Sequence, residues 1–224
     1  MSIIKTDEHY TPQEVKKVIR KYAMERGYIT PNTKLITPFY VGGDYTKEDY
    51  TDRVVFDNPP FSIFKQIINY YNSHDIPFFL YYNGKTAFGV YKYTTKPVTI
   101  ILVHQHIIYL SGVAVQTCFV TNIDPYTHDL CKRNSLILSK DLSQDLYKVT
   151  PRRWVPKRKP LPHIAPLDYD ATISPMQLEK YIRRLKHDTI FYIKDVSDRD
   201  ELGRRIYGGG VRLIPSSDDK MGAT

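Results

Sequence analysis

Apolar residues recur at three- and four-residue spacing in three stretches of the chain, which is the pattern of an amphipathic helix. The first stretch opens with Thr11-Pro12-Gln13-Glu14, a capping box with proline in the first helical position, and it ends at Gly27. A second helix is expected after Ser62 and a third after Ser174, because serine is a favoured N-cap. Each helix has one apolar face, so each is expected to pack against a core.

Short apolar runs bounded by polar residues, glycine or proline predict the strands. They are residues 34–36, 53–57, 76–82, 98–103, 107–110, 114–120 and 189–193, with a tight turn at Ser111-Gly112. Strands and helices alternate in the first part of the chain and strands then follow one another, which predicts an α/β sandwich. In such sheets ligands bind beyond the carboxyl ends of the strands, where Pro38 and Asn58 would both lie.

The length of 224 residues suits one domain with a small appendage. We divide the chain into an α/β domain of residues 1–147 and a part of residues 148–224 that holds a basic connector and a C-terminal helical segment, a possible DNA-recognition region. The 32 basic and 24 acidic side chains leave a formal net charge of +8, which favours a polyanionic partner. The 19 tyrosines suit stacking on bases as well as ordinary packing.

Cysteine usage and hydropathy point to the cytoplasm. Cys118 and Cys131 make neither a metal set nor a disulfide framework, and a reducing cytosol fits them. The first residues lack the apolar stretch of a secretory signal, and no apolar run approaches the ~20 residues of a membrane span, so no membrane contact is expected. His104 and His106 share one face of a strand, but no further ligands stand at a suitable spacing, so no metal site is expected.

The segment Asp57-Asn58-Pro59-Pro60-Phe61 carries the most specific chemistry in the chain. Its two prolines have no backbone N–H and hold the chain extended, with carbonyl oxygens outward. The exocyclic amine of a base needs two hydrogen-bond acceptors, which the Asn58 side chain and the Pro59 carbonyl could supply, while Phe61 could stack on a flipped base. The structural alternative is a rigid loop, since Asn-Pro often starts a turn.

Asn58-Pro59-Pro60-Phe61 at the end of a strand resembles the catalytic motif of amino-methylating DNA methyltransferases, most often the adenine-N6 class. Together with residues 36–45 and 115–122, it is similar to bacteriophage methyltransferase-like proteins, some of which are labelled chromosome-partitioning proteins. The resemblance covers about residues 8–123. It implies a Rossmann-like class I methyltransferase sandwich, S-adenosylmethionine as the methyl donor and DNA as the partner. The catalytic residues that it implies are Asn58, Pro59, Pro60 and Phe61.

The resemblance also implies a cofactor site. The segment that borders the methionine moiety corresponds to Tyr10, Thr11 and Pro12. The glycine-bearing loop after the first strand corresponds to Pro38, Phe39, Gly42, Gly43 and Asp44, and Asp57 could steady the motif or face the cofactor. Each assignment has a structural alternative, namely a helix cap at Thr11, a turn at residues 41–44 and a strand-end cap at Asp57.

The chain departs from the family pattern in the cofactor region. The loop lacks the usual leading acid and the usual spacing of its glycines. Only about twenty residues separate it from Asn58, where the family fits a helix, a second strand with an acid for the ribose, and a third strand. The missing acids could be replaced by Asp44, Asp49 or Asp52. The expected fold is therefore a methyltransferase sandwich that is reduced between the cofactor loop and the catalytic motif.

A cationic segment follows the methyltransferase-like part. Residues 148–160 hold six cations, one tryptophan and three prolines, a composition typical of an extended connector. The resemblance places target recognition in this part of the chain. The residues expected to bind DNA are Arg152, Arg153, Trp154, Lys157, Arg158 and Lys159. A solvated run of charge is the alternative.

Two functions are compatible with these features. The first is S-adenosylmethionine-dependent methylation of the adenine N6 amino group of a flipped base in DNA, by a phage-encoded enzyme in the cytosol of a bacterial host. The second is non-catalytic nucleic-acid binding on a degenerate methyltransferase fold, which the short interval after Gly43 favours. The recognition sequence, the choice between adenine and cytosine, and the oligomeric state stay open.

Overall fold

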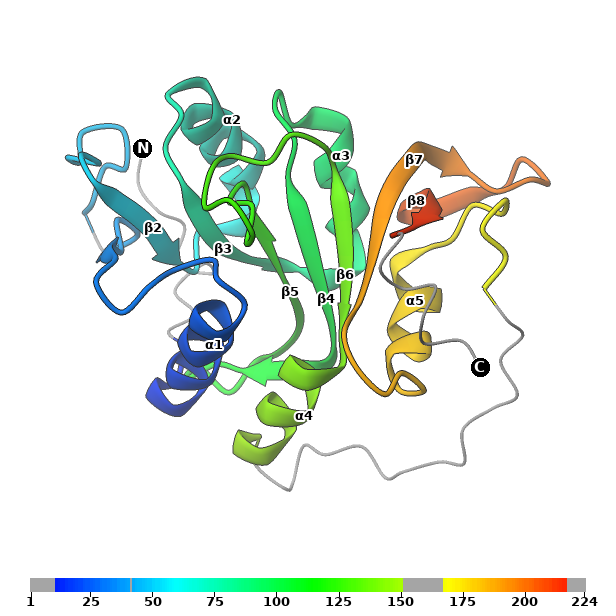
Figure 1. Cartoon of the computed structure of the whole chain (residues 1–224), viewed down its shortest axis with the longest axis horizontal. Coiled ribbons are helices and arrows are strands. Elements are labelled where there is room, and N and C mark those ends of the chain that lie inside the picture. Colours follow the sequence, from blue (N-terminus) through cyan, green and yellow to red (C-terminus); the bar gives the residue numbers. More distant parts are fainter. Residues whose placement is uncertain (1–10, 41, 151–166, 217–224) are drawn as a thin grey trace.

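A computed structural model describes residues 11–40, 42–150 and 167–216, and its centre is a single eight-stranded mixed sheet (Figure 1). The strands are β1 (Lys34–Ile36), β2 (Arg53–Asp57), β3 (Phe78–Asn83), β4 (Thr99–Ile108), β5 (Ala114–Thr121), β6 (Ser135–Ser139), β7 (Thr189–Arg199) and β8 (Arg205–Pro215). The α-helices are α1 (Gln13–Glu25), α2 (Phe64–Ser73), α3 (Val90–Tyr93), α4 (Lys140–Val149) and α5 (Pro175–Ile182). The expected mixed α/β class is confirmed.

The strand order is β1-β2-β3-β5-β4-β6-β7-β8. The pairs β1–β2, β2–β3 and β4–β6 are parallel, and the other four pairs are antiparallel. The strands β5 and β7 therefore run against the other six. The carboxyl ends of β1, β2, β3 and β4 lie at one edge of the sheet, which we call the carboxyl edge.

Helices cover both faces of the sheet. The helices α1 and α4 pack on one face, over a core that includes Phe56, Phe79 and Ile101. The helices α2, α3 and α5 pack on the other face, over a core that includes Val55 and Leu80. The alternation of Val55 and Phe56 between the two cores shows that β2 is covered on both sides, as its apolar run predicts.

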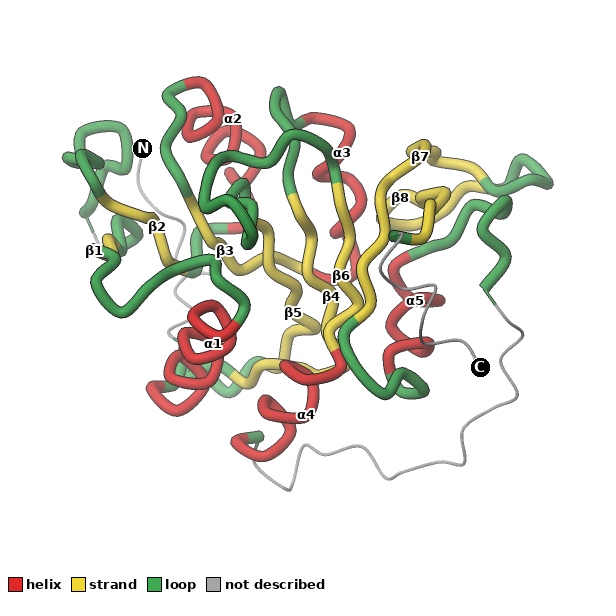
Figure 2. Tube along the Cα trace, viewed as in Figure 1, coloured by secondary structure: helices red, strands yellow, loops and turns green. Residues whose placement is uncertain are grey.

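The described part of the connection from β1 to β2 contains no helix, although parallel neighbours are usually joined by a helical crossover (Figure 2). Tyrosines hold it against α2 instead. The hydroxyl of Tyr50 donates to the Tyr45 carbonyl at 2.5 Å, and that of Tyr70 donates to the Thr46 carbonyl at 3.0 Å. The Tyr45 ring meets the Tyr70 ring edge-on at 5.4 Å. These tyrosines therefore serve packing, which is one of the two uses expected from their number.

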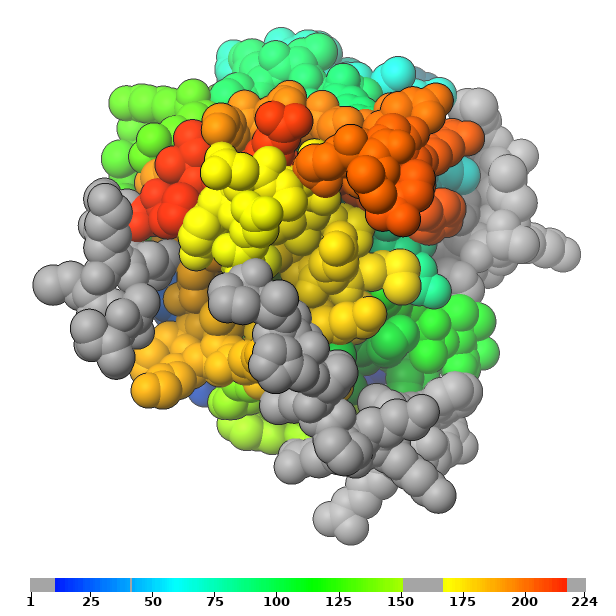
Figure 3. Space-filling view, turned by 90° about the vertical axis from the view of Figure 1, so that its right-hand side faces the viewer, coloured from blue at the N-terminus to red at the C-terminus, as the bar shows by residue number. Residues whose placement is uncertain are grey.

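The C-terminal part of the chain continues the same sheet. The strand β7 pairs with β6, and Leu138 of β6 shares one core with Leu178 of α5. Figure 3 shows the face on which α5 lies beside the β7–β8 hairpin. The parts before and after residue 148 therefore share one sheet and one core.

The strand β8 closes onto the short 3₁₀ helix η3 (Gly84–Gly89) that follows β3. Gly208 has φ +81°, and a Cβ at this position would collide with the Lys85 carbonyl. Only a glycine lets the two backbones approach this closely. Segments more than 100 residues apart in sequence therefore meet in a backbone-to-backbone seam.

Two expected helix caps are wrong. The N-cap of α1 is Pro12, without a side-chain cap, and the Thr11 side chain is buried instead. The residue Glu14 pairs with Lys17 at 2.9 Å rather than closing a capping box. Ser62 lies inside the 3₁₀ turn η2 (Phe61–Ile63), because the Ile63 N–H bonds the Pro60 carbonyl at 3.3 Å and delays the start of α2.

Other expectations hold in part. The N-cap at Ser174, which the structure shows as a full capping box with Gln177, and the end of α1 before Gly27 are confirmed. The runs 98–103 and 107–110 form one continuous strand, β4, with a register shift between Leu102 and His106. The elements β6, α4 and β8 were not expected at all.

Candidate functional site

Two of the expected site segments meet at the carboxyl edge of the sheet. Pro38 and Phe39 follow β1, and Asn58 follows β2, its parallel neighbour. The carboxylate of Asp57, the last residue of β2, joins them. It accepts the Phe39 backbone N–H at 3.1 Å on one oxygen and the Asn58 backbone N–H at 2.8 Å on the other. The loop after β1 and the Asn-Pro-Pro-Phe motif are thus held together by the side chain of Asp57.

The electrostatics of Asp57 are unusual for an aspartate with two N–H donors. Burial raises the pKa of its carboxyl to about 6, against the two backbone hydrogen bonds and the charge of Lys16, which lower it. Lys16 lies in the first turns of α1, so the start of this helix faces the same edge. The carboxyl therefore changes charge near neutral pH at a place where three segments converge.

The motif itself is rigid and mostly covered. Pro59 and Pro60 are buried, whereas Asn58 and Phe61 are half-buried. The Phe61 ring meets the Tyr82 ring edge-on at 5.6 Å, and Tyr82 in turn stacks on Phe64 at 4.0 Å. The orientation of Phe61 is therefore set by the end of β3. Nothing in the sequence pattern marked Tyr82 as part of this site, since it reads as one more aromatic of a buried strand.

The glycines of the loop after β1 are needed by the loop itself. A Cβ on Gly43 would lie 2.8 Å from the Pro38 carbonyl oxygen, and the Gly43 N–H bonds the Tyr40 carbonyl at 2.9 Å. Gly42, in contrast, has open space on the side where a Cβ would lie. The turn interpretation accounts for both glycines, because Gly42 has φ +82°, and of the two only Gly42 also leaves room for a ligand to approach.

Asp44 is used within its own turn. Its carboxylate accepts the Thr46 N–H at 3.0 Å and the Thr46 hydroxyl at 2.7 Å, and it pairs with Lys47 at 3.1 Å. These bonds, first of all that of the Thr46 hydroxyl, lower its pKa to about 2. Asp44 is therefore engaged within its own turn and is not held ready for a ribose.

Thr11 provides a different kind of feature. Its side chain is only 4% exposed, and within the described ranges its hydroxyl has no hydrogen-bond partner. A buried hydroxyl without a partner is costly, so a ligand group that bonds it would be favoured. Thr11, Asp57 and the open side of Gly42 are the described features that could hold the methionine and sulfonium end of S-adenosylmethionine. The adenosine end has no comparable anchor among these residues.

The interval between the loop after β1 and the motif after β2 holds one described strand, β2 itself. Strand β1 pairs directly with β2, and the described residues between them, 37–40 and 42–52, contain neither a helix nor a strand. In the described part of the sheet, β1 is the edge strand.

Several expected site residues lie outside the described residues. They are Tyr10, Arg152, Arg153, Trp154, Lys157, Arg158 and Lys159. Within the described ranges, no group of three or more His, Cys, Asp or Glu side chains is placed to hold a metal ion. His104 instead contacts Glu179 of α5, with 2.9 Å between its Nδ1 and the Oε1 of Glu179.

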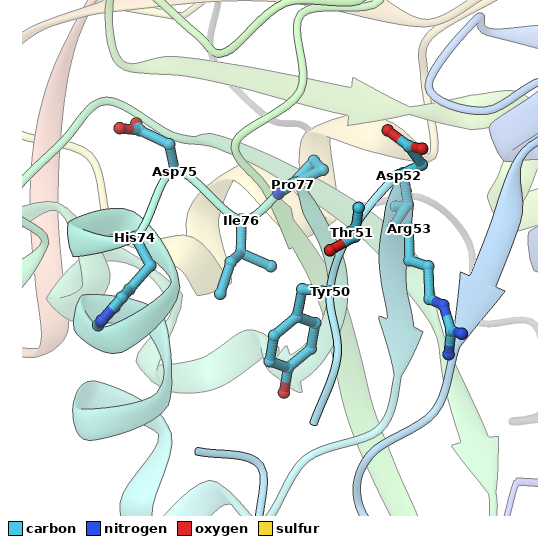
Figure 4. Close-up of a pocket in the computed structure, with 9 residues that line it drawn as sticks. Tyr50, Thr51, Asp52, Arg53, His74, Asp75, Ile76 and Pro77 are labelled. Atoms are coloured by element: carbon cyan, nitrogen blue, oxygen red, sulfur yellow. The ribbon is translucent and has the colours of Figure 1, made fainter. Parts of the chain in front are cut away.

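A surface pocket of about 390 Å³ lies at the opposite edge of the sheet (Figure 4). It is lined by the segments 50–54 and 74–77, which lead into the amino ends of β2 and β3. Asp52 and Asp75 both line it with positive φ, as aspartate tolerates in tight turns. Asn58 stands at the other end of β2, so this pocket is separate from the candidate site.

None of the helices in the described ranges has the length and apolar character needed to cross a membrane. No protein-family model, curated protein or solved structure matches this chain.

Proposed function

We propose that this protein transfers a methyl group from S-adenosylmethionine to the exocyclic amine of a flipped DNA base, with adenine N6 as the first candidate. The observation that carries the proposal is the position of Asp57, whose carboxylate bonds both the Phe39 and the Asn58 backbone. A methyl donor held by the loop after β1 would lie next to a base held by the motif after β2. Such closeness of two reactants is a large part of catalysis.

The motif residues would hold the base and its amine. The side-chain oxygen of Asn58 and the Pro59 carbonyl would accept the two amine hydrogens and direct the nitrogen lone pair outward. Phe61 would stack on the base, with its ring supported by Tyr82. The rigid prolines would keep these groups in place without a cost in loop ordering.

The residues near Asp57 would hold the donor. When bound, S-adenosylmethionine supplies an electrophilic methyl group on a cationic sulfur. Thr11 would bond its methionine end, and the ionised Asp57 would attract the positive charge. The amine nitrogen forms the new N–C bond as the S–C bond breaks, and the amine proton leaves to solvent.

The decisive variant is Asn58→Ala, with Asn69→Ala on α2 as the matched control. The measurements are transfer of label from methyl-labelled cofactor into duplex DNA and thermal melting. Loss of one transition-state hydrogen bond should lower transfer by roughly two to three orders of magnitude. Melting should be unchanged, since Asn58 is in a loop and not in the core. Undiminished transfer in Asn58→Ala would refute the assignment.

The short β1–β2 connection favours a second candidate, non-catalytic nucleic-acid binding on a reduced methyltransferase fold. Without an anchor for the ribose, S-adenosylmethionine should bind with a dissociation constant of tens of micromolar or more, about −6 to −7 kcal/mol. Titration calorimetry with and without DNA distinguishes the two. No heat up to millimolar ligand, with intact DNA binding, would leave only the second candidate.

A further inference from the structure

Three exposed lysines lie on the segments that border the carboxyl edge. Lys16 is in the first turns of α1, Lys65 is the second residue of α2, and Lys85 is in η3, which follows β3. We call these three residues the lysine rim. They belong to three different elements and are far apart in the sequence, so no run of charge in the chain indicates that they border one site.

Lys16 lies on the side of the rim formed by α1. Burial raises the pKa of Asp57, and the positive charge of Lys16 acts against this rise, which places the two side chains near each other. Asp57 in turn bonds the backbone N–H of Asn58 at 2.8 Å. The ammonium group of Lys16 therefore stands beside the start of the Asn-Pro-Pro-Phe motif.

Lys65 borders the motif on the other face of the sheet, where α2 packs. The preceding residue, Phe64, stacks on Tyr82 at 4.0 Å, and the Tyr82 ring meets the Phe61 ring edge-on. The Nζ of Lys65 lies over the Tyr93 ring, 5.9 Å from its centre. The ammonium group of Lys65 is thus held next to the aromatic residues that support Phe61.

Lys85 completes the rim at the end of β3. Its backbone N–H bonds the side-chain oxygen of Asn83, the last residue of β3, at 2.9 Å. Its carbonyl lies in the seam with Gly208, so the backbone of this segment is held from both sides. The exposed side chain of Lys85 therefore leaves the surface from a fixed point beside the strand that carries Tyr82.

The rim lysines are not neutralised by their neighbours. Within the described residues, none of the three forms an ion pair with a carboxylate. Lys17 and Lys21, which lie on the same helix as Lys16, do pair with glutamates. Cations that stay unpaired around a site attract a polyanion to it.

We propose that the lysine rim binds the backbone phosphates on either side of the nucleotide whose base the motif holds. This inference rests on the proposed function, because the phosphates belong to the strand that carries this base. A nucleotide that enters between α1 and α2 brings a phosphate on each side. Lys16 meets the phosphate on the Asp57 side, and Lys65 and Lys85 meet those on the Phe61 side. Contacts of this kind position the strand and carry no sequence information.

The test replaces Lys16, Lys65 and Lys85 by glutamine and measures the affinity for a short labelled DNA duplex between about 50 and 200 mM salt. The loss of three phosphate contacts should flatten the plot of log affinity against log salt by about 2.7, which is about 0.9 for each contact. Replacing the same lysines by arginine keeps the charges and should preserve the wild-type slope. If the triple glutamine variant melts at a lower temperature, the three single variants decide, each with a loss of about 0.9.

A double variant of Lys17→Gln and Lys21→Gln is the matched control, because these lysines are exposed on α1 but paired with glutamates. It should keep the wild-type slope. Methyl transfer gives a second readout, since contacts that only position the strand are made equally before and during the reaction. The triple glutamine variant should raise the KM for DNA on the order of tenfold and leave kcat within about twofold.

The outcomes separate the rim from the proposed function. If the wild-type protein transfers no methyl group but the triple glutamine variant still flattens the salt plot, the methyltransferase fails and the rim stands. If the wild-type protein transfers methyl groups and the triple variant keeps its slope, the rim is a solvated surface and the methyltransferase stands. A fall in kcat with an unchanged KM would also overturn the rim, because the lysines would then act on the chemical step.

Discussion

Asp57 accepts the backbone N–H of Phe39 at 3.1 Å across the boundary between β1 and β2. The contact fixes the start of the cofactor-like loop relative to the motif that follows β2. Because the same carboxylate bonds Asn58, a movement of either segment must disturb the other. The raised pKa of this carboxyl then makes the arrangement dependent on pH in a defined direction.

S-adenosylmethionine should bind more tightly as pH rises through about 6, because the ionised Asp57 attracts the sulfonium. S-adenosylhomocysteine carries an uncharged thioether and should show a flatter profile. Titration calorimetry between pH 5 and 7.5 should give about a tenfold rise in affinity for the first ligand only. Parallel profiles for the two ligands would show that Asp57 does not face the sulfur.

Asp57→Asn should change the pH dependence of stability. The folded protein keeps a proton on Asp57 up to about pH 6, whereas the unfolded chain releases it near pH 4. This contribution to the free energy of unfolding is present below pH 4 and lost as pH rises through 6, by on the order of 2 kcal/mol. Urea unfolding of the variant should lack this fall.

Asp44→Asn is the control for that experiment, because its pKa is shifted the other way, to about 2. Asp44 contributes stability above the unfolded pKa, and this is lost only in stronger acid. Between pH 4.5 and 6.5 the free energy of unfolding of Asp44→Asn should therefore fall with pH as steeply as that of the wild-type protein. If Asp57→Asn and Asp44→Asn both abolish this dependence of stability on pH, the cause is a general effect on the loop.

The cationic segment after α4 should contribute to DNA affinity if the proposed function holds. A variant with alanine at Arg152, Arg153, Lys157, Arg158 and Lys159 should flatten the plot of log affinity against log salt by about 0.9 for each phosphate that the protein no longer neutralises. Trp154 is the single tryptophan of the chain, so its fluorescence should also change when DNA binds. Replacing Lys17 and Lys21 of α1, which pair with glutamates, is the control. An unchanged slope in the first variant would identify a solvated connector.

Gly208→Ala should be far more destabilising than Gly112→Ala, although both glycines have φ +81°. At Gly112 the added methyl meets nothing within 4 Å, so only the backbone strain of about 1–2 kcal/mol is expected. At Gly208 the methyl also collides with the Lys85 carbonyl, and the total should reach roughly 3 kcal/mol or more. The urea midpoints of the two variants measure their losses of stability. Equal losses would mean that β8 can shift away from η3.

Local patterns in the sequence predicted the elements whose causes are local. Ser174 is the expected N-cap of α5, and the strand before Asn58 lies where its apolar run indicated. Thr11 shows the limit of such reasoning, because it has the spacing of a cap and is nevertheless buried without capping. The burial of Thr11 depends on packing against other segments, which a local sequence pattern does not specify.

The features that could not be predicted depend on distant partners. Consecutive glycines weaken a strand, yet Gly208 and Gly209 let β8 close on η3. The role of Tyr82 behind Phe61 and the bond from Phe39 to Asp57 likewise join segments that are separate in sequence. The motif could be predicted because its residues are contiguous in the sequence. The residues that support it, Phe39 after β1 and Tyr82 in β3, are distant in the sequence.

The closure of β8 on η3 also bears on how the chain acquires its structure during synthesis. A contact between Gly208 and Lys85 has high sequence separation, and such contacts slow folding. The apolar face under α5 stays uncovered until Leu178, Val211 and Leu213 have left the ribosome. The nascent chain therefore passes most of its synthesis with exposed strands, a state that favours aggregation and chaperone binding. Slower translation of residues 175–215 should raise the yield of chaperone-bound protein.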